Sequence, residues 1–537
     1  MRTTSYSKCC PADCLRLKHN RRAQQYPLVV LGRPSPMDRV KEVATLTVAL
    51  PETAPPTADP LQPTRADRYA QMAVLVVLLA APALICLHSA VVSDPDIWWH
   101  LRAGEWVVRH HSIPRVDAFS SVNAGKAWPD YSWLYELLTF GLFERFGLMG
   151  IVGYSAAMVL AVTVALYHLV RRLQGDFSVL ALLTFAGCFM MGHLFTPRPW
   201  LFTILFFVLE IDILMRVRRT GRLRELAWLP LIFLSWSNIH IQFIDGLVVL
   251  GIALVEAVAT RRGLGEKTQL GIGPAAAALG ASLVATLANP FGWHIYHVAY
   301  DLASQPGVLN KINELKAIPF RDMTDWSILA MTLISTAILS RAHTLRIFES
   351  GLLAFAIFVG FRSQRDVWVI AAAVIAILAS SLPARKAKAI QLPRFATVLA
   401  AVVAALIVLG GFRVMKLNNT KLETQVDATY PVKAVAAIQA NGYPGPLFND
   451  FNWGGYLIWS LRMPVSIDGR AAFYGDQAID RSVVTWGAET SWNTDPLLKQ
   501  ARIIIGPAKG SLIQVLRLDS AYRLVYEDKI AVVFIRR

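Results

Sequence analysis

Cysteine and charge are both scarce in this chain of 537 residues. Five cysteines are present and none lies beyond Cys188, so no disulfide can form within the chain after that residue. Charged residues make up only 17% of the sequence, whereas hydrophobic residues make up 55%. Because a soluble protein of this size is rarely so apolar, the composition indicates an integral membrane protein.

Motifs for nucleotide binding and for common hydrolases are also missing. The sequence contains no P-loop, no dinucleotide-binding fingerprint, no His-Glu-x-x-His and no Gly-x-Ser-x-Gly. The net charge of +16 does not indicate a nucleic-acid partner, because no nucleic-acid-binding motif accompanies it. Basic cytoplasmic loops are the usual source of such a charge in a membrane protein.

Apolar segments of membrane-spanning length recur through the middle of the chain. About eleven transmembrane helices are predicted, near 70–92, 148–170, 177–195, 200–215, 226–241, 244–260, 272–288, 326–340, 347–361, 367–383 and 395–412. Loops rich in Lys and Arg alternate with loops that are poor in them. The positive-inside rule therefore predicts a cytoplasmic N-terminus and an external C-terminus.

Three regions follow from this pattern. Residues 1–68 are polar, basic and rich in Pro and Thr, which predicts a disordered cytoplasmic tail. Residues 69–412 are predicted to form an α-helical polytopic membrane domain with large external loops at 93–132 and 289–325. Residues 413–537 look soluble and mix helix and strand patterns, which predicts an extracytoplasmic α/β domain.

Within the last region the pattern is specific enough to predict individual elements. A helix is predicted over 431–439, short buried strands over 465–467 and 502–506, and a terminal hairpin from 522–526 and 530–535. These elements together support the α/β assignment.

The run Asp94-Pro95-Asp96-Ile97-Trp98-Trp99-His100 directly follows the first apolar segment. Pro95 suits the first turn of a helix, so two carboxylates stand at a helix start beside the membrane. Asp94 and Asp96 could act as a general base, or could hold a divalent cation such as Mg²⁺ or Mn²⁺. The structural alternative is that Asp94 caps the helix and Asp96 compensates its dipole.

Three neighbours of these carboxylates are candidates for substrate binding: Trp98, Trp99 and His100. Tryptophans at this place are most simply interfacial anchors, but they can also stack on a sugar. Arg198 lies between two prolines, and its guanidinium suits a phosphate, unless it extends to lipid headgroups. His240 could assist proton transfer, or could cap a neighbouring carbonyl.

Arg362 and Arg365 lie in a short loop that the predicted topology places outside. The positive-inside rule opposes arginine there, so these charges need a reason. An anionic ligand such as a lipid phosphate is one reason. Pairing of Arg365 with Asp366, or with the Asp94 and Asp96 pair, is the structural alternative.

Several motifs together carry a family resemblance. The chain resembles a large group of bacterial membrane proteins, and that group is similar to the GT-C glycosyltransferases, which include oligosaccharyltransferase catalytic subunits and protein mannosyltransferases. The resemblance covers about 90–537 and rests on Asp94-Pro95-Asp96-Ile97-Trp98-Trp99-His100-Leu101, Arg198-Pro199, Trp236-Ser237-Asn238-Ile239-His240, Asn289-Pro290-Phe291-Gly292, Trp453-Gly454-Gly455-Tyr456-Leu457 and Asp468-Gly469-Arg470.

The resemblance implies a GT-C-like enzyme of the bacterial inner (plasma) membrane. Such an enzyme transfers a sugar from a polyprenyl-phosphate donor to an external glycan, lipid or protein acceptor. Asp94 would be the general base or metal-organising carboxylate with Asp96 beside it, and Arg198, Arg362 or Arg365 would bind the donor phosphate. The alternative is a non-catalytic protein of the same architecture that binds a lipid-linked glycan or scaffolds envelope assembly. Secondary transport is a third class, disfavoured because the charges cluster at the outer face.

Overall fold

The computed structural model describes residues 64–88, 94–383 and 392–537. The predicted disordered tail therefore lies almost entirely outside the described residues, and helix α1 (Arg65–His88) begins within its last few positions. The chain from Pro60 onward forms one compact unit, which is the unit described below.

All eleven apolar segments predicted from hydropathy contain a helix. These helices are α1, α4 (Leu148–Leu173), α5 (Phe177–Met191), α6 (Trp200–Thr220), α7 (Trp228–Trp236), α8 (Phe243–Arg261), α9 (Ile272–Thr286), α12 (Met323–Ser340), α13 (Ile347–Arg362), α14 (Val367–Ser381) and α15 (Arg394–Val414). Seven helices of the described chain are long and apolar enough to cross a membrane. The structure thus confirms a helical membrane protein, with fewer full-length spans than the eleven predicted, since α7, α9 and α13 are short and α6 carries several charges.

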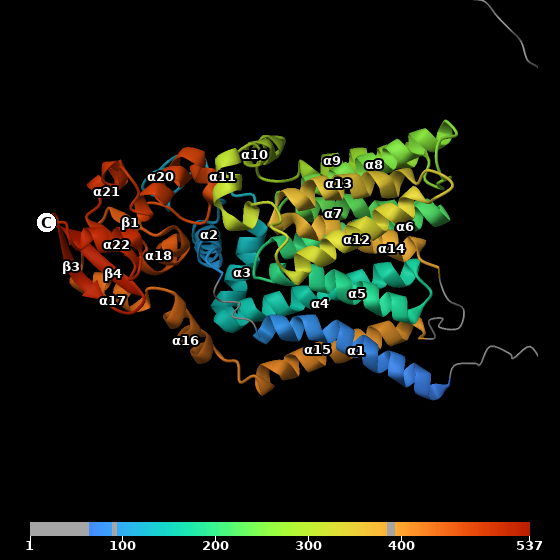
Figure 1. Cartoon of the computed structure of the whole chain (residues 1–537), viewed down its shortest axis with the longest axis horizontal. Helices are drawn as coiled ribbons and strands as arrows, with labels where there is room; N and C mark the ends of the chain where they lie inside the picture. The colour runs from blue at the N-terminus through green and yellow to red at the C-terminus, as the bar shows by residue number, and fades with distance from the viewer. Residues whose placement is uncertain (1–63, 89–93, 384–391) are drawn as a thin grey trace, which may run out of the picture. The chain divides into compact units, whose positions relative to one another are not determined.

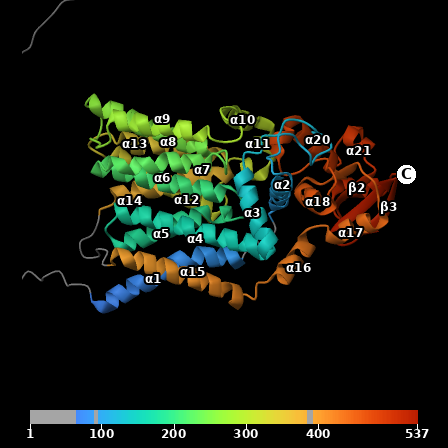
Figure 2. The same ribbon diagram turned by 180° about the vertical axis from the view of Figure 1, so that it is seen from behind.

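Helix α14 forms the centre of the bundle. All its residues from Val367 to Ala379 are buried, as expected for a segment that is apolar on every face. It packs against α4, α5, α6, α12 and α13. Helices α1 and α15 lie side by side and pack on α4 at the edge of the bundle (Figures 1 and 2).

The segment between α1 and α4 contains two helices, α2 (Ile97–His110) and α3 (Trp133–Phe146). They pack closely because Gly104 of α2 has no side chain: a Cβ there would overlap the backbone carbonyl of Glu136 and lie 2.7 Å from Cβ of Phe140. Helix α2 also packs against the C-terminal region, so protein surrounds its first turns on two sides.

The C-terminal region is a small α/β unit. Its elements are α16 (Asn419–Thr429), α17 (Val432–Asn441), β1 (Leu447–Asn449), α18 (Gly454–Leu461), α19 (Ala471–Tyr474), α20 (Asp476–Trp486), α21 (Pro496–Gln500), β2 (Ile503–Pro507), α22 (Ser511–Leu516), β3 (Tyr522–Glu527) and β4 (Ala531–Arg536). The sheet order is β1-β2-β4-β3, with β1 parallel to β2 and the other pairs antiparallel.

This region confirms most of the local predictions. Helix α17, strand β2 and the β3–β4 hairpin lie where the pattern predicts them. The strand predicted over 465–467 is wrong: Val465 makes a single parallel bridge to Ser120, outside the sheet. The triplet is apolar because Val465 and Ile467 are both buried, each in a different hydrophobic cluster.

Candidate active site

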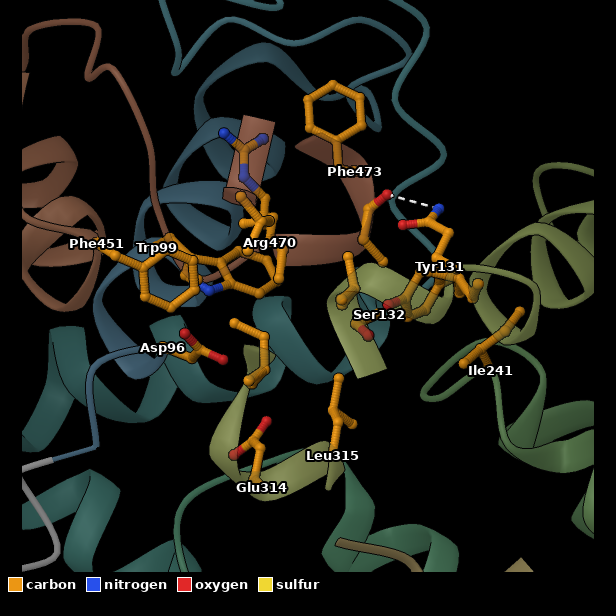
Figure 3. A pocket seen from close by; sticks show the side chains of 18 of the residues that line it. Asp96, Trp99, Tyr131, Ser132, Ile241, Glu314, Leu315, Phe451, Arg470 and Phe473 are labelled. Carbon is orange, nitrogen blue, oxygen red and sulfur yellow. Dashed lines mark hydrogen bonds between the residues drawn. The ribbon is translucent and has the colours of Figure 1, made fainter. Parts of the chain in front are cut away.

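A cavity of about 1100 Å³ opens where the α2–α3 segment, the ends of several bundle helices and the C-terminal region meet. Its wall includes Asp96, His100, Arg198, His240 and Arg365 from the residues predicted as candidates. Two more short helices, α10 (His294–Ala303) and α11 (Pro306–Lys311), border it. In Figure 3 the carboxylates of Asp96 and Glu314 lie in the lower half of the cavity.

Arg198 joins the two carboxylates of the opening motif. Its Nε donates to both oxygens of Asp94, at 2.8 and 2.7 Å, and its Nη1 donates to Asp96. A third carboxylate, Glu314, lies 3.8 Å from Nη2. The predicted pairing of an arginine with the Asp94–Asp96 motif therefore exists, but it comes from Arg198 and not from Arg365.

The structure separates the roles of the two aspartates. Asp96 lines the cavity, whereas Asp94 is not among the residues of its wall. Asp96 holds the N-cap position of α2 but makes no capping hydrogen bond, while Asp94 accepts from the backbone N–H of Asp96 at 3.0 Å. The predicted cap, Asp94, thus accepts a backbone hydrogen bond just ahead of α2, while the side chain of Asp96 turns towards Arg198.

Gly469 of the Asp468-Gly469-Arg470 motif makes room for the Asp96 carboxylate. A Cβ at Gly469 would overlap Asp96 Oδ1. Another glycine of the C-terminal region, Gly455, brings its backbone close to the same helix start, since a Cβ there would lie 2.6 Å from the carbonyl oxygen of Pro95. The C-terminal region therefore forms part of the wall around Asp96.

The single guanidinium of Arg198 neighbours the three carboxylates of Asp94, Asp96 and Glu314, so this cluster keeps an excess of negative charge. Burial raises the pKa of Asp96 to about 7; Arg198 opposes this shift, and the negative charges of Asp94 and Glu314 add to it. A carboxylate with such a pKa can take up a proton near neutral pH.

The predicted divalent-cation site does not fit this arrangement. Among residues 64–88, 94–383 and 392–537, no three His, Cys, Asp or Glu side chains converge where they could hold a metal ion. The Arg198 guanidinium supplies the positive charge between Asp94 and Asp96. No metal-dependent step is derived for this site.

The two tryptophans of the motif, Trp98 and Trp99, have different surroundings. Trp98 is buried against the rings of Tyr430 and Tyr456, at centroid distances of 5.5 and 5.2 Å, and does not line the cavity. This placement corrects both predicted roles of Trp98, because protein and not lipid or sugar surrounds it. Trp99 does line the cavity and contacts Trp128 edge to face, which gives the wall an aromatic surface.

His100 lines the cavity, and contacts with Glu136 and Trp99 hold its ring in place. Its Nδ1 lies 2.9 Å from Glu136 Oε1 of α3, and its ring packs on Trp99. Burial lowers the pKa of His100 well below its ordinary value, helped by the positive charge of Arg198, so the imidazole is neutral. The contact of Nδ1 with Glu136 holds the ring in place and leaves Nε2 as the ring nitrogen that does not contact Glu136.

Glu136, which contacts His100, forms a buried pair of acidic side chains with Asp130. Glu136 Oε2 and Asp130 Oδ2 are buried without a donor in the described part of the chain, and the two carboxyl groups lie within hydrogen-bonding reach of each other. Burial raises the pKa of Glu136 well above its ordinary value and that of Asp130 to about 6. One shared proton would satisfy both oxygens.

His240 is held in a similar way on the opposite side of the cluster. Trp236 Nε1 donates to Thr203 Oγ1 at 2.8 Å, and Thr203 Oγ1 lies 2.9 Å from His240 Nδ1. Because the indole N–H can only donate, the Thr203 hydroxyl is free to donate to Nδ1. Burial lowers the pKa of His240 to about 3, so the neutral ring then carries its proton on Nε2. His240 therefore does not cap a carbonyl through Nδ1.

The two arginines of the short loop before α14 have different surroundings. Arg365 lines the cavity, and its Nε lies 3.7 Å from Asp366 Oδ1. Gln242 already donates to that same oxygen at 2.7 Å. Arg362 is exposed, donates to the carbonyl of Ala303 at 3.0 Å and does not line the cavity. Of the two, only Arg365 can meet a ligand in the cavity.

One motif of the family resemblance, Asp468-Gly469-Arg470, contributes to the cavity wall, although the sequence predicted no ion pairs for its side chains. Arg470 donates to both oxygens of Asp468, at 2.9 and 2.7 Å, and to Asp117 at 2.8 Å. It also lies over the ring of Trp128. Asp117 belongs to the segment before α3, so this buried ion pair connects that segment to the C-terminal region. The Asp-Gly-Arg motif was the available signal, but it also reads as a plain turn.

Comparison with known proteins gives a likeness of fold. No family model and no curated protein matches the sequence. Similarity is found to solved structures, each with a TM-score below 0.5. The oligosaccharyltransferase of Archaeoglobus fulgidus, solved with a tethered acceptor peptide, is 11% identical with a TM-score of 0.47, and the match covers 88% of this chain and 74% of that chain.

Two further structures give similar values. The apo form of the same oligosaccharyltransferase is 11% identical with a TM-score of 0.45, over 83% of this chain and 70% of that chain. ArnT from Cupriavidus metallidurans, bound to undecaprenyl phosphate, is 13% identical with a TM-score of 0.45, over 86% of this chain and 97% of that chain. Such likeness concerns the fold and does not identify a function.

Proposed function

We propose that this protein is an integral membrane glycosyltransferase that transfers a sugar from a polyprenyl-phosphate donor to an extracytoplasmic acceptor. The observation that carries the proposal is the position of Asp96. Its carboxylate lies on the wall of a cavity of about 1100 Å³, at the end of a membrane helix bundle, with an aromatic surface at Trp99 beside it. A lipid-linked substrate can reach such a site from the membrane while its sugar enters the cavity.

Each cavity residue has a role in this reaction. Asp96 accepts the proton of the acceptor hydroxyl while the hydroxyl oxygen forms a bond to the anomeric carbon of the sugar. The bond from that carbon to the phosphate oxygen breaks, and its electron pair leaves with the phosphate. Arg365 and the Nε2–H of His240 stabilise the departing phosphate. Asp94 holds Arg198 in place and so positions Asp96.

The distribution of arginines supports an external cavity. Arg172, Arg218 and Arg346 all lie at or near the ends of bundle helices remote from the cavity, and each is paired there with an acidic side chain. By the positive-inside rule this end is cytoplasmic. The cavity and the C-terminal region would then face the outside, where polyprenyl-phosphate sugars and envelope acceptors meet.

The test uses the full chain in lipid and a panel of undecaprenyl-phosphate hexoses and pentoses. Release of undecaprenyl phosphate is measured for the wild type, Asp96→Asn and Asp94→Asn. We expect Asp96→Asn to lose at least about a hundredfold in turnover while it stays folded, because the general base is removed. Asp94→Asn should lose stability together with activity. Unchanged turnover in both variants would remove the catalytic proposal.

A second candidate function is a non-catalytic protein that binds a lipid-linked glycan. The ion pair of Asp96 with Arg198 favours it, because a carboxylate with a bound guanidinium also serves a purely structural role. Donor binding without release of undecaprenyl phosphate, at equal affinity in wild type and Asp96→Asn, would decide for this alternative.

A further inference from the structure

A second pocket, of about 260 Å³, lies between the ends of α4 and α6 and the start of α15. Helix α6 begins at Trp200 in the wall of the large cavity and ends at Thr220 in the wall of this pocket. Because an α-helix rises about 1.5 Å per residue, the two sites lie roughly 30 Å apart. Nothing in the proposed transfer reaction uses this pocket.

Arginine dominates its wall. The charged residues that line it are Arg172, Arg216, Arg219, Arg222, Arg394 and Asp212. Two of the arginines have acidic partners: Arg172 pairs with Asp212, and Arg216 lies 2.5 Å from Glu225. The other three make no ion pair in the described part of the chain. The pocket therefore carries an excess of about three positive charges.

A neighbouring arginine shows that the protein does neutralise such charges elsewhere. Arg218 lies on α6 between two of the pocket arginines, faces the interior and is bound by two carboxylates. Glu256 accepts from its Nε at 2.6 Å, and Glu349 accepts from its Nη1 at 3.1 Å. Three exposed arginines of the pocket, Arg219, Arg222 and Arg394, lack this compensation, so an anion from outside the chain would relieve their mutual repulsion.

We propose that this pocket binds a phosphate-bearing anion. Guanidinium groups match phosphate oxygens in a bidentate manner and keep their charge at all physiological pH values. Leu173 and Met215 add an apolar wall beside the arginines, which suits the glycerol end of a lipid. The position between helix ends, where a membrane surface meets water, favours the phosphate of an anionic lipid headgroup as its source.

The matched control exists at the same end of the bundle. Arg261, Arg262 and Lys267 are exposed, make no ion pair in the described chain and do not line the pocket. The pocket variant replaces Arg219, Arg222 and Arg394 by Gln, and the control variant replaces those three other residues by Gln. Each variant loses three positive charges, and the paired Arg172 and Arg216 stay intact in both.

Binding of phosphatidylglycerol to the full chain in neutral detergent is measured by native mass spectrometry, with phosphatidylcholine as the zwitterionic comparison. We expect the pocket variant to lose at least about tenfold in phosphatidylglycerol affinity and the control variant to change less than about twofold. Equal losses in both variants would show diffuse surface attraction only and would overturn the proposal, as would full retention in the pocket variant.

Inorganic phosphate separates the two sources of the anion. If a lipid headgroup is the ligand, millimolar phosphate should leave bound phosphatidylglycerol in place. If a free phosphate compound is the ligand, phosphate should displace the lipid in the wild type and bind far more weakly to the pocket variant. Both results support the pocket as an anion site. Release of undecaprenyl phosphate stays unaffected in either case, so failure here is independent of the transferase proposal.

Discussion

Arg198 binds Asp94 through one nitrogen: its Nε lies 2.8 and 2.7 Å from the two carboxylate oxygens of Asp94. This contact leaves the Nη groups of Arg198 directed at Asp96 and Glu314. Asp94 therefore binds Arg198, and the carboxylate that lines the cavity is that of Asp96, two residues later.

The first prediction concerns the stability of this cluster. Arg198→Met would leave two buried carboxylates without a counter-charge, so we expect the free energy of unfolding to fall by about 3–5 kcal/mol. Thermal unfolding of the purified chain in detergent measures the loss. Adding Asp94→Asn to Arg198→Met should recover part of it. An Arg198→Met variant as stable as the wild type would contradict this prediction.

The second prediction concerns the contact of Gly469 with Asp96. A methyl group at Gly469 would overlap the carboxylate, so Gly469→Ala should cost about 1–3 kcal/mol and reduce turnover. Gly410→Ala is the matched control, because Gly410 of α15 has open space at its Cβ position. Alanine also favours helix, so the control should be neutral or slightly stabilising. Unfolding curves and donor cleavage of both variants give the comparison.

The third prediction separates two neighbouring arginines. Arg365 lines the cavity and Arg362 does not. We expect Arg365→Gln to raise the KM for the polyprenyl-phosphate donor by about tenfold or more, because a charge-assisted contact to phosphate is lost. Arg362→Gln should leave KM within about twofold. Steady-state kinetics on both variants measure the KM for the donor. Equal changes in KM would show that Arg365 does not bind the donor phosphate.

The fourth prediction follows from the pKa of Asp96, which burial raises to about 7. A general base must be deprotonated, so kcat/KM should rise as the pH increases through about 7 and level off above it. Glu314→Gln removes a negative charge that contributes to the shift, so the midpoint should move to lower pH. A pH profile of donor cleavage tests both statements. An unchanged midpoint in Glu314→Gln would show that another group controls the profile.

Local sequence predicts the elements that depend on local pattern. Hydropathy places a helix in all eleven apolar segments, and the two apolar runs at 522–526 and 530–535 place the β3–β4 hairpin, because each pattern shows which residues of a single element are buried. The strand predicted over 465–467 failed for the same reason: an apolar triplet shows burial but does not show what buries it. Helix length adds a condition that apolarity alone does not, since seven helices of the described chain are both long and apolar enough to cross a membrane.

The site was only partly predictable. Seven of the nine candidate residues touch the cavity or hold one that does, since Asp94 acts through Arg198 while Trp98 and Arg362 face elsewhere. Glu136 and Asp130 were not singled out, and the partner of Asp117 was not predicted, because an isolated acidic residue gives no sign of which distant side chain it will meet. Their roles appear only when α3 packs on α2 and the C-terminal region closes over both.

The sequence by itself determined that this is a polytopic helical membrane protein with a small α/β region at its end and an acidic motif beside the first span. Those properties follow from hydropathy, periodicity and turn chemistry, which act over a few residues. Only the tertiary structure decided that Asp96 and not Asp94 lines the cavity. That choice depends on Arg198 and Gly469, which lie more than a hundred and more than three hundred and seventy positions away, and contacts over such separations are set by packing.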